Sequence, residues 1–156
     1  MQNSVMKVAI IGAGPRGLWA SEELMERARE RGAAIDVTVF DAKPLEESSA
    51  PGAFRDSVPE EFILNAPKSI VETKLGPLDP NDELPGDFPS RKHVGEHLDK
   101  SWRALEENLP PRCSLTHRVA DIEMVEPTDD GVVVLGEHYD EVLMVTGHAH
   151  DWPGSL

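Results

Sequence analysis

Three glycines near the start of the chain, Gly12, Gly14 and Gly17, follow a short apolar run and precede a stretch with helical periodicity. In a G-x-G-x-x-G pattern between a buried strand and a helix, each glycine has a mechanical task. The first allows a tight turn, the second lets a pyrophosphate approach the backbone, and the third lets the helix pack close to the strand. The amide groups and dipole at the helix start attract phosphate. This context favours a phosphate site over the alternative, a glycine-rich turn without a ligand.

An acidic residue, Asp41, ends the second apolar run, roughly twenty residues beyond the glycines. A carboxylate in this place can accept hydrogen bonds from the ribose hydroxyls of an adenosine. It would repel a 2′-phosphate, so the pattern favours FAD or NAD over NADP. Taken alone, Asp41 is equally consistent with the acid of a turn at a strand end. Together with the glycines, it indicates a β-α-β unit that binds a dinucleotide.

The sequence also predicts the elements that would position these residues. Residues 8–11 form a continuous apolar run, as in a strand buried on both faces of a parallel sheet. We expect a helix over residues 15–31, with Pro15 in its first turn and Gly32 as its stop. Residues 35–40, rich in β-branched and aromatic types, predict the second strand. The helix side chains expected to face the sheet are Leu18, Ser21, Met25 and Ala28.

Residues 42–89 form a long segment in which regular structure is hard to find. Eight prolines interrupt every candidate helix in it. Long loops inside a compact domain are usually functional or disordered. The apolar patch at residues 62–64 favours an ordered segment laid over the domain, which in a flavoprotein would line the ribityl chain and the ring. The alternative is a surface loop pinned by Phe62 and Leu64.

Helix and strand patterns return after this segment. Ser90 can cap a helix over residues 91–108. Leu115 marks a short strand, residues 117–135 predict a small antiparallel β-meander, and residues 140–145 form a last apolar strand. The stripe of the helix that we expect to be buried consists of Val94, Leu98, Trp102 and Leu105.

Composition narrows the range of functions. The chain has 156 residues and a net charge of −14, with 39% hydrophobic residues, which is typical of one globular domain. The acidic balance argues against nucleic acids and anionic membrane surfaces as partners. The only cysteine, Cys113, excludes an internal disulfide, and a small buried role suits it better than a nucleophilic one. We see no signal peptide and no membrane-spanning run, and expect a cytoplasmic location.

Two histidine groups suggest a competing metal chemistry. His93, Glu96 and His97 read H-x-x-E-H, the inverted zinc-protease motif, and on a helix the two histidines would share one face. A zinc hydrolase is therefore a remote alternative, although no later helix is expected to supply a third acidic ligand. His148 and His150 also look metal-like, but they follow a break in the last strand. We assign no metal ligand, and the chain has no G-x-S-x-G elbow of a serine hydrolase.

Several stretches together resemble a known family. They are V-A-I-I-G-A-G-P-R-G (8–17), V-F-D (39–41), F-I-L-N-A-P (62–67), P-S-R-K-H-V-G-E-H-L (89–98) and Y-D-E-V-L-M-V-T-G-H (139–148). The chain resembles the FAD-binding half of two-dinucleotide-binding flavoproteins of the glutathione-reductase type. More narrowly, it is similar to bacterial FAD/NAD(P)-binding proteins with a long proline-rich connection. The resemblance implies an α/β, Rossmann-like, three-layer domain over residues 1–156, with a central parallel sheet, helices on one face and a small antiparallel β-meander.

The resemblance also implies roles for single residues toward FAD, with NAD as the alternative cofactor. The pyrophosphate would be held by Gly12, Ala13, Gly14, Pro15, Arg16 and Gly17. Asp41 would hold the adenosine ribose, with Ala42 and Lys43 beside the ribose and adenine. Asn65 would approach the ribityl or isoalloxazine part, and Arg91 would contact flavin phosphate or shape the pocket. Val119 matches the position whose backbone pairs with adenine, and Thr146 and Gly147 would lie close to the pyrophosphate.

The resemblance finally implies what lies outside the chain. Family enzymes carry a second G-x-G-x-x-G domain for NAD(P)H, together with substrate-binding elements, and this chain ends at Leu156 before any such domain. We therefore expect a fragment or stand-alone module from a flavin-dependent oxidoreductase or monooxygenase-like protein, with the NAD(P)H site supplied by a partner domain or a homo-oligomer. The alternative is a non-catalytic dinucleotide-binding module. The flavin carries the electrons in such chemistry, so we name no catalytic side chain.

Overall fold

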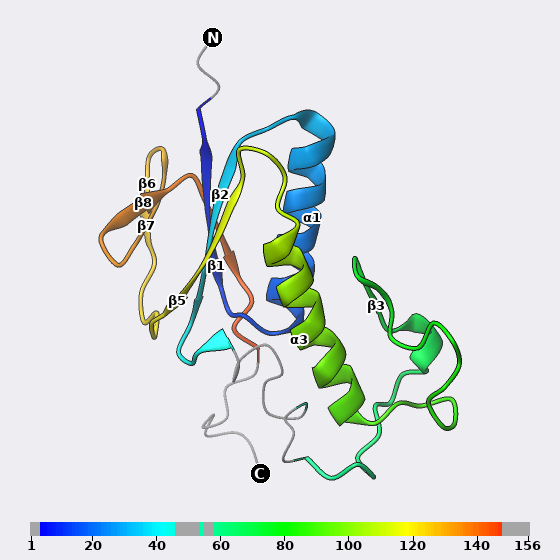
Figure 1. The fold of residues 1–156 in the computed structure, drawn as a ribbon. Coiled ribbons are helices and arrows are strands. Elements are labelled where there is room, and N and C mark those ends of the chain that lie inside the picture. Colours follow the sequence, from blue (N-terminus) through cyan, green and yellow to red (C-terminus); the bar gives the residue numbers. More distant parts are fainter. Residues whose placement is uncertain (1–3, 46–53, 55–57, 148–156) are drawn as a thin grey trace.

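A four-stranded parallel sheet forms the centre of the molecule (Figure 1). The computed structural model describes residues 4–45, 54 and 58–147. The sheet order is β5-β2-β1-β9, with β1 at Met6–Ile11, β2 at Ile35–Asp41, β5 at Ser114–Val119 and β9 at Glu141–Met144. The two middle strands are buried on both faces, which explains why they read as continuous apolar runs. The expected α/β class is confirmed.

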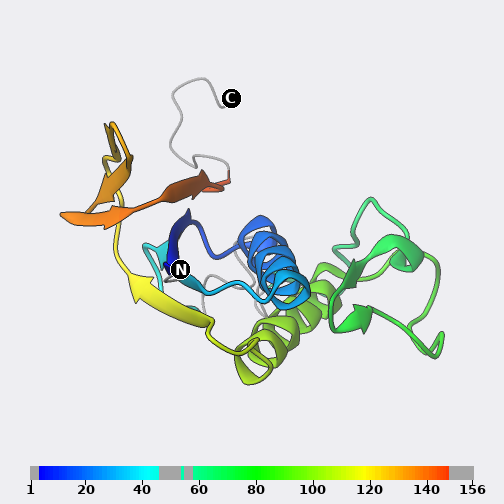
Figure 2. The same cartoon turned by 90° about the horizontal axis from the view of Figure 1, so that it is seen from above.

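Two long helices cover one face of this sheet (Figures 1 and 2). Helix α1 spans Pro15–Arg31 and ends at Gly32, which adopts the left-handed conformation with φ 60°. Helix α3 spans Arg91–Glu107, and the Ser90 hydroxyl caps it by accepting from the His93 amide at 3.2 Å. Both helices begin at the end of the molecule where the sheet strands end (Figure 1). Their core side chains include Leu18, Met25, Ala28, Val94, Leu98 and Trp102.

A small antiparallel β-meander covers the other face (Figure 2). It consists of β6 at Glu126–Thr128, β7 at Gly131–Val134 and β8 at Glu137–Tyr139. The side chains that join it to the sheet are Ala9, Ile11, Phe40, Val132, Val134 and Tyr139. The molecule is therefore layered as meander, sheet and helices, as the sequence predicted.

The bounds predicted for the meander, residues 117–135, are corrected by the structure. His117 and Val119 belong to β5, which pairs in parallel with β2 at the edge of the central sheet. The meander itself begins only at Glu126 and extends to Tyr139. The error has a simple cause, because alternating polar and apolar residues occur in any half-buried strand. Alternation alone cannot distinguish a meander strand from an edge strand of the parallel sheet.

In the proline-rich segment, residues 58–89 lie on the outer side of the helices (Figure 2). Its described part includes a short 3-10 helix, η2 at Lys68–Ile70, and two-residue strands, β3 at Glu72–Thr73 and β4 at Gly76–Pro77. Polar contacts contribute to its order. The Lys68 ammonium lies 2.7 Å from an Asp79 carboxylate oxygen and donates to the Leu84 carbonyl at 2.7 Å.

The alternative interpretation, a surface loop pinned by Phe62 and Leu64, is right for only one of the two side chains. Leu64 packs against the main core, whereas Phe62 leaves 59% of its surface exposed. The backbone holds this part of the chain instead. The Arg91 amide donates to the Phe62 carbonyl at 2.8 Å, and the Leu64 amide donates to the Pro89 carbonyl at 2.8 Å. These bonds fasten the segment to the start of α3.

Candidate dinucleotide-binding site

The turn between β1 and α1 brings Gly12 against the end of β9. Gly12 has φ 118°, a backbone conformation that residues with a Cβ atom rarely adopt. A Cβ at this position would lie 2.4 Å from the Val145 carbonyl oxygen and 2.8 Å from its carbon. The Gly12 amide donates to the Phe40 carbonyl at 2.7 Å, and the Val145 amide donates to the Ile11 carbonyl at 2.8 Å. The turn therefore fits between the ends of β2 and β9 only without a side chain.

Gly17 meets the same turn from the helix. A Cβ on Gly17 would lie 2.1 Å from the Gly12 carbonyl oxygen, so α1 can pass this close to the strand only with glycine there. Gly14 is the N-cap and no side chain caps it, while Pro15 is the first helical residue. The steric tasks predicted for Gly12 and Gly17 are thus present in the fold. The approach of a pyrophosphate to Gly14 stays a prediction.

Hydrogen bonds fix the Ala13 backbone on both sides. Its amide donates to Asp41 Oδ2 at 2.9 Å, and its carbonyl accepts from the indole Nε1 of Trp102 at 3.2 Å. Ala13 and Trp102 are both buried. Neither contact was predicted from the sequence, because the partners lie 28 and 89 residues away along the chain.

The Asp41 carboxylate organises the loop ends around it. In addition to Ala13, it accepts from the Lys43 amide through Oδ1 at 3.1 Å. The side chain is half-buried. A carboxylate offers roughly four lone-pair positions on its two oxygens, so it can accept further hydrogen bonds besides these two. Asp41 therefore holds the glycine-rich loop in place, a task that the sequence pattern did not reveal.

Several other predicted residues gather at the same edge of the sheet. Ala42 and Lys43 follow β2 and are exposed. Val119 pairs with Asp41 in the β5–β2 register and is 63% exposed, so it ends β5 and does not begin the meander as expected. Thr146 and Gly147 follow Val145 and are exposed beside the glycine-rich turn.

Asn65 and Arg91 belong to a neighbouring region, beside the start of α3. Asn65 is exposed, and the Arg91 guanidinium carbon lies 5.7 Å from the centre of the Phe54 ring. A cavity of about 250 Å³ joins this region to Pro15 at the start of α1. Its lining is almost wholly apolar and includes Pro15, Trp19, Phe54, Leu64, Ala66 and Ile70. Arg16 is exposed on the first turn of α1.

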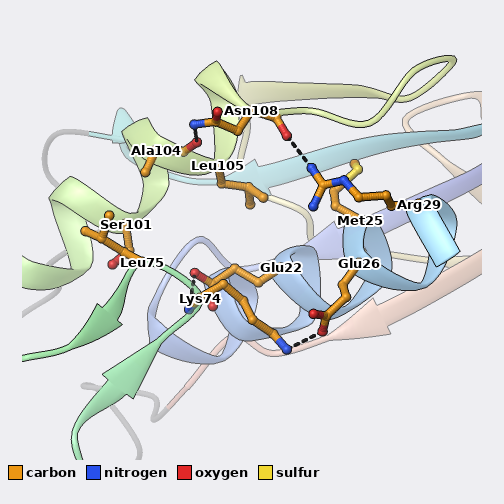
Figure 3. Close-up of a pocket in the computed structure, with 10 residues that line it drawn as sticks. All are labelled: Glu22, Met25, Glu26, Arg29, Lys74, Leu75, Ser101, Ala104, Leu105 and Asn108. Carbon is orange, nitrogen blue, oxygen red and sulfur yellow. Dashed lines mark hydrogen bonds and ion pairs between the residues drawn. The ribbon is translucent and has the colours of Figure 1, made fainter.

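A second cavity, of about 320 Å³, lies between α1, α3 and the β3–β4 hairpin (Figure 3). Its charged groups are already paired. The buried Glu22 carboxylate accepts from the Lys74 amide at 3.1 Å, and the Lys74 ammonium forms an ion pair with Glu26. Across the cavity, Arg29 donates to the Asn108 carbonyl at 2.8 Å (Figure 3). Burial raises the pKa of Glu22. These contacts fasten the hairpin and α3 to α1.

The histidines of the H-x-x-E-H motif face different partners. His93 Nδ1 lies 3.0 Å from the Ser90 hydroxyl at the helix cap. His97 is buried, and its Nε2 lies 3.2 Å from the Thr73 hydroxyl, which in turn lies 2.7 Å from the Ser101 hydroxyl. Within residues 4–45, 54 and 58–147, no three His, Cys, Asp or Glu side chains are placed to hold a metal ion together. His148 and His150 lie outside the described residues.

The contacts of His97 predict a dependence of stability on pH. Burial lowers the pKa of His97, an effect that outweighs the hydrogen bond of its ring to the Gly76 backbone. The unfolded chain therefore takes up the proton first. We expect the free energy of unfolding to fall as the pH decreases below about 6.5, the ordinary pKa of histidine, until the folded protein is protonated too. Urea unfolding between pH 7.5 and 5.5 measures this slope, and a His97→Gln variant with the same slope would contradict it.

These features together define a class of protein. A parallel sheet, a glycine-rich turn from β1 into α1 and an acid at the end of β2 are the elements of a Rossmann-like dinucleotide-binding domain. The family model described as FAD-NAD(P)-binding matches residues 9–149, and the chain belongs to that family. Comparison with curated proteins found no match. In the described part of the chain, no helix is both long and apolar enough to cross a membrane.

Proposed function

We propose that the chain is one domain that binds FAD in an extended conformation, as the flavin half of a cytoplasmic oxidoreductase or monooxygenase-like protein. One observation carries the proposal. The open N-terminus of α1 and the Asp41 carboxylate meet at one edge of the sheet, joined through Ala13. The first suits a pyrophosphate and the second suits a ribose, the two groups that adjoin each other in a dinucleotide.

Different residues at this edge of the sheet would bind different parts of the cofactor. The first turn of α1, including the exposed Arg16, would hold the pyrophosphate, and the positive side chain offsets part of the protein's negative charge. Asp41 would accept from the ribose, with Ala42, Lys43 and the Val119 backbone around the adenine. Thr146 and Gly147 would close over the pyrophosphate from β9.

The flavin end would lie toward the apolar cavity beside Pro15. This cavity has a volume of about 250 Å³, and its apolar lining is suited to a flat, largely apolar ring. Asn65 and Arg91 stand near it and can donate hydrogen bonds to the ribityl chain or a phosphate. When bound, FAD supplies the hydride and electron chemistry. The chain's own residues bind it, orient it and keep water from the apolar side of the ring. A partner domain or a second subunit would supply the NAD(P)H site.

The test begins with the visible absorption spectrum of the purified protein, before and after incubation with FAD and desalting. We expect a flavin spectrum that survives desalting, and calorimetric binding of NAD⁺ that exceeds any binding of NADP⁺, because Asp41 repels a 2′-phosphate. A protein that binds NAD⁺ but not FAD would instead be the non-catalytic dinucleotide module. A colourless protein that binds none of these ligands would disprove the proposed function.

A further inference from the structure

We infer that Trp102 is a positioning residue of the dinucleotide loop, which turns the Gly14 amide toward the ligand. This inference rests on the proposed function, because it names a residue outside the loop on which binding depends. Trp102 lies at the start of the fourth turn of α3 and is 0% exposed. Its indole Nε1 donates to the Ala13 carbonyl at 3.2 Å, and indole has no other polar group to offer.

The direction of the Gly14 amide follows from the geometry of the peptide bond. In a planar trans peptide, the carbonyl oxygen and the following N–H point in opposite directions. The Ala13 carbonyl points toward Trp102 inside the core. The N–H of Gly14 belongs to the same peptide, so it must point away from the core, toward the open start of α1.

The preceding peptide obeys the same rule and supports this arrangement. The Ala13 amide points toward Asp41 Oδ2 at 2.9 Å. The Gly12 carbonyl, on the other side of that peptide, points toward α1, where a Cβ on Gly17 would come within 2.1 Å of its oxygen. Two successive peptides are thus held in fixed orientations, one through Asp41 and one through Trp102.

Loss of the indole N–H would remove the hydrogen bond that orients the peptide between Ala13 and Gly14. The buried Ala13 carbonyl would lack a donor, and leaving it unpaired is costly. Rotation of the peptide would bring the carbonyl toward solvent and turn the Gly14 amide inward. The loop would then present an oxygen instead of an N–H to the phosphates, which repels the ligand that the loop should attract.

Trp102 itself packs against the edge strand β5 of the sheet. Its ring meets the His117 ring of β5 edge to face, with centroids 4.8 Å apart and planes at 80°. His117 Nε2 lies 3.2 Å from a carboxylate oxygen of Glu106, on the next turn of α3. The contact with His117 therefore restricts the orientation of the indole between α3 and β5, as is needed in a residue that positions a loop.

A Trp102→Phe variant tests the inference because it keeps an aromatic ring and removes the donor N–H together with the five-membered ring that carries it; the loss of packing alone is measured by a control variant. We expect about tenfold weaker FAD binding by calorimetry, the effect of one lost hydrogen bond at the site. In the ligand-free protein we expect faster hydrogen exchange at the Ala13 amide, which donates to Asp41 in the neighbouring peptide. Both measurements are made at a temperature where the variant is fully folded.

Leu105→Ala is the matched control. Leu105 lies three residues further along the same helix and packs partly buried against the same core, and it has no bond to the loop. Its loss should lower the unfolding temperature but leave FAD affinity and Ala13 exchange at wild-type values. A Trp102→Phe protein that matches Leu105→Ala in both measurements would overturn the role of Trp102. Wild-type protein that binds no dinucleotide would instead overturn the proposed function, and the binding role with it.

Discussion

Replacement of Gly12 with alanine is expected to abolish dinucleotide binding. The new Cβ would lie 2.4 Å from the Val145 carbonyl oxygen and 3.2 Å from the Thr146 amide nitrogen, both of them backbone atoms that cannot rotate away. The backbone at Gly12 also has φ 118°, which alanine rarely adopts. The loop or β9 must move, at a cost of about 2–4 kcal/mol. Calorimetric titration with FAD and NAD⁺ should show no binding.

Gly32→Ala is the control for this variant. Gly32 also has a positive φ, at 60°, but no atom lies within 4 Å of its ideal Cβ, and it stands at the opposite end of α1. It should lose about 1–2 kcal/mol of stability from backbone strain and bind ligand as the wild type does. If Gly12→Ala still binds with wild-type affinity, the glycine-rich turn is not the phosphate site.

The second large effect is expected for Asp41→Asn. Asparagine has nearly the same shape but only one acceptor oxygen, whereas Asp41 accepts from the amides of both Ala13 and Lys43. One amide would face the NH₂ group of asparagine, and the charge that holds the loop would be lost. A hydrogen bond to a charged group contributes about 2 kcal/mol, so FAD affinity should fall about thirtyfold. The preference for NAD⁺ over NADP⁺ should weaken too.

Asp36→Asn provides the comparison, since it lies in the same strand at the other end of the sheet. The Asp36 carboxylate accepts from the Ser114 hydroxyl at 2.7 Å in an exposed position. Its loss removes the same charge from β2 far from the loop. Equal affinities in the Asp36 and Asp41 variants would show that neither loop order nor ribose binding depends on Asp41.

Local signals in the sequence were sufficient to predict the first β-α-β unit and both helices. Helix α1 has the predicted bounds because proline, glycine and the apolar stripe mark both ends within a few residues of the chain. The cap of α3 at Ser90 was equally local. The position of β5 was not, because pairing with β2 depends on residues nearly eighty positions earlier, such as Asp36 opposite Ser114.

The candidate site divides in the same way. The glycines and Asp41 were recognisable because their spacing is tied to one β-α-β unit. The two hydrogen bonds of the Ala13 backbone, to Asp41 and Trp102, could not be predicted. A tryptophan in the apolar stripe of a helix indicates a core residue whether or not its N–H has a partner. The apolar cavity beside Pro15 was also hidden, since its walls come from α1, α3 and the proline-rich segment together.

The contact between Gly12 and Val145 has a consequence for the order in which the protein is built. The strand that completes the loop is synthesised some 130 residues after the glycines, because β9 spans Glu141–Met144 and Val145 follows it directly. A nascent chain that has emerged only as far as the meander already contains the glycines, Asp41 and Trp102. It still lacks β9 and Val145, the backbone against which the glycine-rich turn packs. Contacts of such long range close late in folding. The proposed site is therefore complete only once β9 is in place, and dinucleotide binding is expected only late in the folding of the domain.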